Sequence, residues 1–459
     1  MGVTLRRSAP PSAHPAGPQP SVPPDEYEQR IRTLYAQAAV DWVVVYADRE
    51  HMANLAFLCG FDPRFEEAAL LIGPAERRVL LVGNEGLGHA VQATVRLDVL
   101  LAQSFSLMGQ SRSQAPRLRD SLRRAGIDAG ATIGVVGWKY LEPEECDDPA
   151  VPAFIPALLA NELAQRVGPA GSVIDITALL MHPAHGLRTQ NSAAQIAMFE
   201  WAAAQASDAV LRIVQGARPG QSERQAAAAM GYAGDPLSCH VMLVSGDDGA
   251  LNGLRSPSAR VLNIGDGVTT AVGYWGGLAC RAGLLRDTPD PSFLSTYVEP
   301  YFQTIATWYQ AVKIGVSGGE VYRSIQAALS DAPFGAALNP GHLTSFDEWL
   351  HTPIRAASNE SITSGMLFQC DIIPTPLPPG TALNCEDTIA VADVALQAEL
   401  KAAYPELWAR ITARRQFMRD VLGIALPDEV LPLSSAPAYL PPFWLASDLI
   451  CTLAPTSNR

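Results

Sequence analysis

The sequence contains few charged residues and no long basic run. Charged side chains make up 17% of the 459 residues, and the formal net charge is −13. Such a chain repels nucleic-acid phosphates and anionic lipids, and no stripe of lysine and arginine offsets that repulsion. We therefore expect no nucleic-acid partner and no membrane partner.

Cysteine is also scarce. The seven cysteines are an odd number, are widely scattered and form no Cys-x-x-Cys pair, which argues against a disulfide framework and a zinc finger. Arg6 and Arg7 are not followed by the apolar segment of a secretory signal. No apolar run reaches the length of a membrane span. We expect a cytoplasmic protein.

Apolar residues, by contrast, make up 48% of a chain long enough for two or three domains. Residues 1–24 are rich in proline, alanine and serine, which predicts a disordered leader. Residues 25–185 alternate helical patterns with short apolar runs, which predicts an α/β domain with a mostly buried sheet. Its expected strands include Trp42–Tyr46, Ala68–Ile72, Arg78–Val82 and Thr132–Gly137, and Ser113–Ala125 reads as a basic helix.

A second domain is expected over residues 186–425, again α/β (α+β) but with antiparallel strands. Ser222 has the position of a helix cap. A helix over 396–422 should break or kink near Pro405. Residues 426–459 read as a proline-rich tail.

Polar residues with catalytic chemistry concentrate in this second domain. His342 follows Pro340-Gly341, Asp371 follows Gly365-Met366 at a short distance, and Glu386 precedes Asp387. They supply an imidazole and two carboxylates in the order and spacing of a metallohydrolase centre. An unpaired carboxylate buried in the apolar strand around Asp371 would cost several kcal/mol. It must face a partner, and His342 is the obvious one, although a purely structural His–Asp pair would satisfy that need equally well.

The joint order of these motifs resembles the pita-bread superfamily of creatinase, aminopeptidase P and methionine aminopeptidase. The series runs from Pro219-Gly220…Glu223 through Gly341-His342 and Gly365-Met366 to Glu386-Asp387. Asn54–Phe61 resembles the amino-terminal domain of creatinase and prolidase-type members. The resemblance covers about residues 25–420. It implies a pita-bread domain preceded by a creatinase-type α/β domain, Xaa-Pro peptidase-like chemistry and a homodimer.

In metal-dependent members, the resemblance implies two ions held by two aspartates, one histidine and two glutamates, with a shared water as nucleophile. His342, Asp371 and Glu386 fall on the histidine and the two glutamates. Ala271 and Cys280 stand where the two aspartates would be. We therefore expect the dinuclear centre to be absent and no cofactor to be required. A mononuclear zinc or manganese site on His342, Asp371, Glu386 and Cys280 stays open.

Creatinase, which works without metal, implies a histidine base in the loop 245–252, where this chain has Leu251. His240 lies nearby and could substitute. His351 could be a displaced second substrate-facing histidine. Arg281 could bind a substrate carboxylate or reach solvent, and Trp275 could line the substrate pocket or belong to the core.

Cys280 admits three readings: a buried small apolar residue, a thiolate ligand, or a nucleophile beside His342. The function expected first is hydrolysis of a C–N bond in a small amide, dipeptide or guanidino-type metabolite. His342 would act as general acid/base, and Asp371 and Glu386 would orient it or a water. The alternatives are a pseudoenzyme that uses the pita-bread cleft for binding, and a lyase or isomerase that uses His342 and Cys280.

Overall fold

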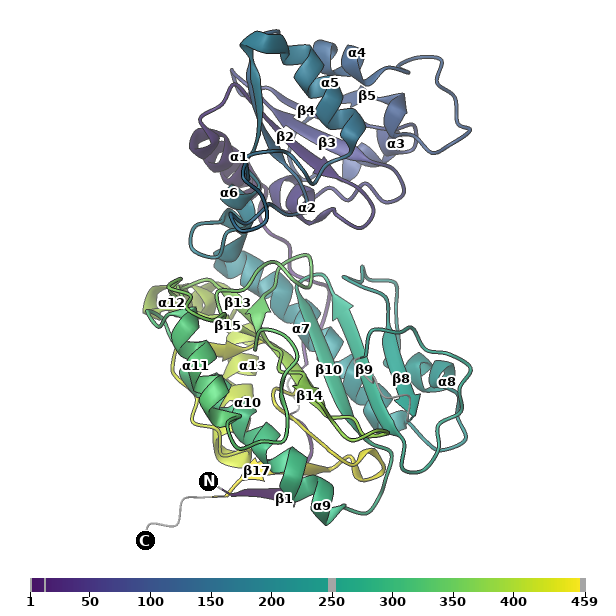
Figure 1. The fold of residues 1–459 in the computed structure, drawn as a ribbon, viewed down its shortest axis with the longest axis vertical. Coiled ribbons are helices and arrows are strands. Elements are labelled where there is room, and N and C mark those ends of the chain that lie inside the picture. Colours follow the sequence, from purple (N-terminus) through teal and green to yellow (C-terminus); the bar gives the residue numbers. More distant parts are fainter. Residues whose placement is uncertain (1, 12–13, 247–252, 455–459) are drawn as a thin grey trace. The chain divides into compact units, whose positions relative to one another are not determined.

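The computed structural model describes residues 2–11, 14–246 and 253–454. Its contacts divide the chain into two compact units. Unit 2 is Val22–Thr189, and unit 1 combines the described residues up to Ser21 with those from Gln190 onward. Unit 2 therefore interrupts unit 1 in the sequence, and each unit is described by itself (Figure 1).

Unit 2 is built on a six-stranded sheet in the order β5-β4-β3-β2-β6-β7. Strand β3 is antiparallel to both neighbours, whereas the other pairs are parallel. The strands are β2 (Trp42–Ala47), β3 (Ala68–Ile72), β4 (Arg78–Val82), β5 (Asp98–Leu101), β6 (Thr132–Val136) and β7 (Ser172–Asp175). The helices are α1 (Pro24–Ala38), α2 (Ala53–Cys59), α3 (Gly86–His89), α4 (Leu118–Ala125), α5 (Ala157–Val167) and α6 (Ala178–Met181). The predicted α/β character and the four predicted strands are confirmed.

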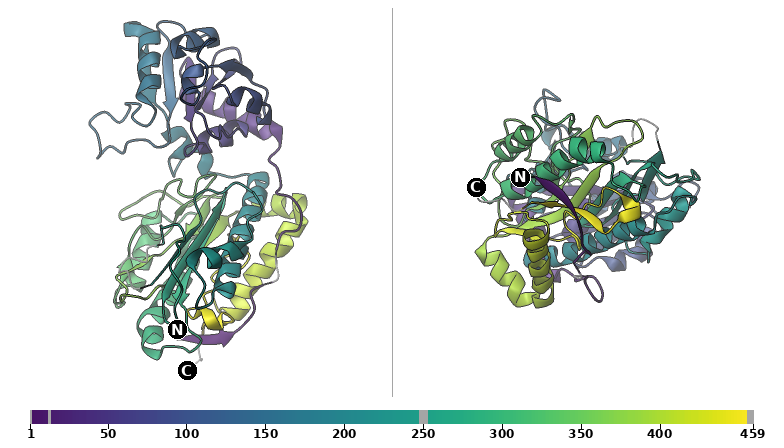
Figure 2. Two further views of the ribbon diagram at one scale, coloured as in Figure 1. Left: turned by 90° about the vertical axis from the view of Figure 1, so that its right-hand side faces the viewer. Right: turned by 90° about the horizontal axis from the view of Figure 1, so that it is seen from below.

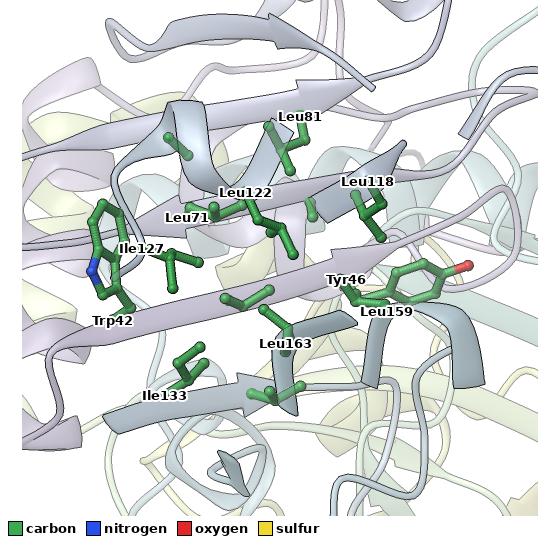
Figure 3. Close-up of a cluster of buried hydrophobic side chains, with 14 of the residues drawn as sticks. Trp42, Tyr46, Leu71, Leu81, Leu118, Leu122, Ile127, Ile133, Leu159 and Leu163 are labelled. Atoms are coloured by element: carbon green, nitrogen blue, oxygen red, sulfur yellow. The ribbon is translucent and has the colours of Figure 1, made fainter. Parts of the chain in front are cut away.

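The core of unit 2 lies between this sheet and helices α4 and α5 (Figure 3). Strand β2 reads WVVVYA and is buried throughout, as expected of a strand covered on both faces. Each of the two helices turns a pair of leucines toward the sheet: Leu118 and Leu122 from α4, and Leu159 and Leu163 from α5. Helix α4 begins five residues later than the predicted basic helix, because only its second part carries the apolar stripe.

Unit 1 contains a seven-stranded antiparallel sheet in the order β12-β13-β15-β10-β9-β8, with β16 paired to β15. Its strands are β8 (Met242–Gly246), β9 (Gly267–Tyr274), β10 (Gly277–Leu284), β12 (His342–Leu343), β13 (Leu367–Cys370), β15 (Asn384–Val391) and β16 (Val430–Pro432); β11 (Gly335–Ala336) and β14 (Pro374–Thr375) form a separate pair. The helices are α7 (Ala193–Gly216), α8 (Glu223–Ala227), α9 (Pro291–Phe293), α10 (Glu299–Ala311), α11 (Gly318–Ala328), α12 (Val394–Ala403) and α13 (Pro405–Gln416). The antiparallel character is as predicted.

The long helix α7 covers one face of β9 and β10 (Figure 1). Ser192 caps it by accepting a hydrogen bond from the backbone N–H of Gln195. Val272 and Ala279 belong to the apolar cluster that α7 shares with these strands. Because successive residues of a strand point to opposite faces, Ala271 and Cys280 point away from α7. That opposite face carries the site described below.

The two ends of the described chain form a small sheet of their own. Strand β1 (Val3–Arg7) pairs antiparallel with β17 (Leu449–Leu453), as the purple and yellow strands of Figure 2 show. The sequence led us to expect a disordered leader over 1–24 and a separate tail over 426–459. The structure differs, because β1 of the first segment pairs with β17 of the second, and the described residues up to Ser21 belong to unit 1 together with the described part of the tail.

The carboxy-terminal helical region breaks where the sequence indicated. Helix α12 ends at Ala403 and α13 begins at Pro405, whose missing N–H is tolerated in the first turn. Across the described ranges, no helix is long and apolar enough to cross a membrane.

Candidate functional site

One transverse row of the unit 1 sheet contains the candidate site. Met242 lies opposite Ala271, Ala271 opposite Cys280, and Cys280 opposite Glu386, on the successive strands β8, β9, β10 and β15. Asp371 follows β13, where Cys370 lies opposite Asp387. The row is therefore apolar at one end and acidic at the other.

His342 is brought to the acidic end by a tight turn. Gly341 has a φ of +103°, and a Cβ at this position would lie 2.8 Å from Trp308 Nε1 and 2.9 Å from the carbonyl oxygen of Gln369. Trp308 Nε1 also donates to the carbonyl oxygen of Pro340 at 2.7 Å. Only glycine fits here. The turn sets His342 opposite Gln369 on β13.

His342, Asp371 and Glu386 converge as the sequence predicted. One ligand atom from each lies within 4.8 Å of the others, and all three residues are buried. His342 Nε2 lies 4.0 Å from Glu386 Oε1. Asp371 Oδ1 is buried and has no hydrogen-bond partner among the described residues. An orphaned carboxylate oxygen in this position is available to a water, a substrate or an ion.

A fourth residue, Glu348, completes the surroundings of His342 and was not singled out from the sequence. Glu348 Oε1 lies 2.9 Å from His342 Nε2, and its side chain is 26% exposed. On the other side of the ring, Nδ1–H donates to the carbonyl oxygen of Leu343 at 3.2 Å. The indole of Trp349 stacks on the imidazole with ring centres 4.1 Å apart. Glu348 lies in the segment where only His351 drew attention, and nothing in the sequence ranks this acid above its neighbour Asp347.

Burial and charge set the protonation states of the cluster. Burial, the largest single effect, lowers the pKa of His342, but the charge and hydrogen bond of Glu348, the charge of Asp371 and the backbone of Leu343 together raise it more, so the net result is a raised pKa. Burial raises the pKa of Asp371 to about 6 despite the opposing effect of His342. The pKa of Glu386 is raised well above its usual value by burial and by the charges of Asp371 and Glu348. The imidazole and the two carboxyl groups therefore all hold protons more tightly than usual.

The residues present do not fit a dinuclear metal centre. Ala271 has no donor atom and packs in an apolar cluster with Met242, Leu278 and Cys280. Burial, with Glu386 and Asp371 adding, raises the pKa of the Cys280 thiol well above its usual value, so it stays a neutral thiol. Two divalent ions would lack the bridging carboxylates that balance their charge. His342, Asp371 and Glu386 do have the donor types for a single ion, and the orphaned Asp371 Oδ1 fits that use.

The other predicted histidines lie outside this three-residue cluster. His240 is exposed, and its Nε2 lies 2.8 Å from the carbonyl oxygen of Leu254. His351 forms an isolated β-bridge with Leu343 of β12: its carbonyl oxygen accepts from Leu343 N at 2.7 Å, and its Nδ1 accepts from Thr352 N at 2.8 Å. Leu251, the position implied for a creatinase-type base, lies outside the described residues.

Arg281 and Trp275 serve other contacts. Arg281 is 1% exposed and points away from Cys280. It donates to both carboxylate oxygens of Asp387 at 3.0 and 2.9 Å and to four backbone carbonyl groups. These contacts give Arg281 a structural role and leave no need for a substrate carboxylate as its partner. Trp275 lies at the tip of the β9–β10 hairpin, edge-to-face with Phe346 at 5.9 Å.

The fold recurs in solved structures of peptidases. The prolidase from Thermococcus sibiricus matches with a TM-score of 0.67 and 15% identity, covering 92% of this chain and 99% of that one. The prolidase from Pyrococcus horikoshii OT3 matches with a TM-score of 0.62 and 16% identity, covering 80% and 95%. The X-Pro aminopeptidase from Thermotoga maritima MSB8 matches with a TM-score of 0.59 and 16% identity, covering 79% and 95%.

No protein-family model matches the chain, and no curated protein sequence matches it significantly. At identities this low, the likeness to solved structures establishes the fold and nothing finer. The chain has the prolidase fold, in which a pita-bread domain is combined with a creatinase-type α/β domain.

Proposed function

We propose that the protein is a hydrolase that cleaves a C–N bond in a small amide, amidine or dipeptide without a dinuclear metal centre. The observation that carries this proposal is the convergence of buried His342, Asp371 and Glu386 within 4.8 Å. Keeping an imidazole and two carboxylates buried together is costly unless they are used. The solved structures that share the fold include an Xaa-Pro dipeptidase, which supports a dipeptide as one substrate class.

The geometry suggests a role for each group. Asp371 Oδ1, which has no partner, takes a proton from the attacking water. His342, charged beside Glu348, gives a proton to the leaving nitrogen. Glu386, as a neutral acid, donates a hydrogen bond to the carbonyl oxygen as negative charge develops on it. A single divalent ion on the same three side chains would, when bound, polarise that carbonyl group.

Replacement of His342 tests the proposal. We expect His342→Ala to abolish turnover of whichever Xaa-Pro dipeptide or creatine-like amidine the wild type cleaves, while the unfolding transition stays cooperative. The control is His89→Ala, which removes a histidine of unit 2 and should leave turnover unchanged. Full activity of a folded His342→Ala variant would contradict the assignment. Activity measured with and without a chelator separates the metal-free route from the single-ion route.

A second candidate function is ligand binding without catalysis. It is favoured by the apolar half of the row, where Ala271 and Cys280, at the positions that the resemblance assigns to two aspartates, pack in an apolar cluster with Met242 and Leu278. Purified protein that turns over no member of the substrate panel but retains a copurified small molecule would support this reading. Turnover of any substrate in the panel would instead show that the protein is a hydrolase.

A further inference from the structure

The proline-rich segment near the amino terminus lies in a groove of unit 1, and three contacts fix it there. We call residues 14–20 the strap. Trp201 Nε1 donates to the carbonyl oxygen of Gly17 at 3.1 Å. Gln19 Nε2 donates to the carbonyl oxygen of Met198 at 3.2 Å, and His14 Nδ1 lies 2.7 Å from Asp208 Oδ2. The strap therefore follows α7 over about ten residues of that helix.

The groove has an aromatic and apolar lining that the strap only partly fills. Pro15, Pro18 and Pro20 of the strap share a cavity of about 320 Å³ with residues of α7 and of the α12–α13 corner. On the unit 1 side, its main apolar contributors are Trp201, Tyr404 and Leu407. Figure 2 shows the purple segment beside the yellow-green helices.

This arrangement has the two elements of proline recognition. Proline rings pack well against flat aromatic side chains, and a side-chain N–H that donates to the peptide carbonyl fixes the register. Trp201, which is 9% exposed, donates this hydrogen bond and lines the same cavity as the three prolines. Arg410, also in the lining, is committed to Glu200 at 2.9 and 2.7 Å. Glu406 adds one acidic side chain to a lining that is otherwise mainly apolar.

We propose that this groove is a recognition site for proline-rich peptides, which the chain fills in cis with its own strap and which a proline-rich peptide in trans can occupy when the strap leaves. The proposal is independent of the candidate catalytic cluster, since none of that cluster's residues lines the groove.

Gly17 offers a way to release the strap without touching the groove. Its φ is +91°, a conformation that other residues adopt only with strain. A Cβ built at this position meets nothing within 4 Å. Gly17→Ala therefore raises the free energy of the docked strap through backbone strain alone, because the added methyl group clashes with nothing.

The experiment measures binding of a labelled peptide with the sequence HPAGPQP to the full-length chain by fluorescence anisotropy. We expect Gly17→Ala to bind it about tenfold more tightly than the wild type, in which the strap competes. Trp201→Phe in the Gly17→Ala background should weaken binding about fivefold, because the donated hydrogen bond is lost. A peptide with its three prolines changed to alanine serves as the control and should not bind measurably.

Equal affinity of the wild type and Gly17→Ala for the peptide would overturn the proposal, and so would equal binding of the proline-free peptide. If the Trp201→Phe double variant fails to fold, the comparison of wild type and Gly17→Ala with both peptides decides the question by itself.

Discussion

At the scale of single residues, Glu348 sets the state of the candidate site. Glu348 Oε1 lies 2.9 Å from His342 Nε2, and Glu348 makes the largest of the contributions that oppose the burial favouring a neutral ring. The ion pair explains how an imidazole that is 1% exposed can carry a positive charge. The stacked indole of Trp349 limits the movement of the ring on one side.

We predict that Glu348→Gln lowers the pKa of His342, as measured by NMR titration of the ring. The folded-state pKa of His342 lies above its unfolded value of 6.5, so its contribution to stability is fully present below pH 6.5. It is lost as the pH rises through the folded-state pKa. Glu348→Gln should remove most of this pH dependence and about 1–3 kcal/mol of stability below pH 6.5. Asp347→Asn is the matched control, and an unchanged His342 pKa in Glu348→Gln would contradict this account.

The sequence predicts part of this site and not the rest. His342, Asp371 and Glu386 could be predicted because each lies next to a recognisable glycine turn or strand pattern. Glu348 could not, because it belongs to a segment without regular secondary structure, in which no periodic pattern shows which side chains face His342. The role of Arg281 was ambiguous for another reason. Strand alternation predicts the face of the sheet on which its side chain lies, but it does not predict that the carbonyl groups of Ala436 and Tyr439 lie on that face and accept its hydrogen bonds.

At the scale of secondary-structure elements, the β9–β10 hairpin carries Ala271 and Cys280, which belong to the apolar half of the row. Its tip is pressed against α7, since a Cβ at Gly276 would lie 2.0 Å from a ring carbon of Phe199. The contact between the hairpin and α7 fixes the position of the hairpin. It therefore also fixes the positions of Ala271 and Cys280 next to Glu386. Strand positions were largely predictable from apolar runs, whereas this contact depends on a long-range match of surfaces.

We predict that Gly276→Ala lowers the free energy of unfolding by about 1–3 kcal/mol more than Gly265→Ala does. Both glycines have positive φ, +110° and +92°, so the backbone strain is similar. Only at Gly276 does an added methyl group meet a neighbour, whereas nothing lies within 4 Å of the Cβ position at Gly265. Chemical denaturation followed by circular dichroism measures the difference, and equal losses would rule out the proposed contact.

At the scale of the whole molecule, strands from the two sequence segments of unit 1 pair with each other, although unit 2 lies between those segments in the sequence. Composition alone suggested an unstructured leader over residues 1–24, because prolines and small residues bury little surface. The pairing of β1 with β17 lies outside what such a local argument can predict, since the partners are separated by more than 440 residues.

Removal of residues 2–8 should therefore weaken unit 1 and spare unit 2. Hydrogen exchange should show lost protection in β17, whose backbone partners are gone, while β3 and β4 keep theirs. A matched control keeps the segment but replaces the five residues of β1, Val3–Arg7, by a sequence with similar strand propensity, such as VTVKK, and should keep the protection of β17. Unchanged exchange in β17 after the deletion would show that β1 does not stabilise it.

The apolar half of the row, with no donor atom at Ala271 and a neutral thiol at Cys280, is the feature on which the proposed function depends. Its most direct test is the stoichiometry of zinc and manganese binding, measured by calorimetry on the wild type and on the double variant Ala271→Asp/Cys280→Asp. We predict at most one ion per wild-type chain and two ions per chain of the double variant. Two ions bound to the wild type, or no gain in a folded double variant, would contradict the account.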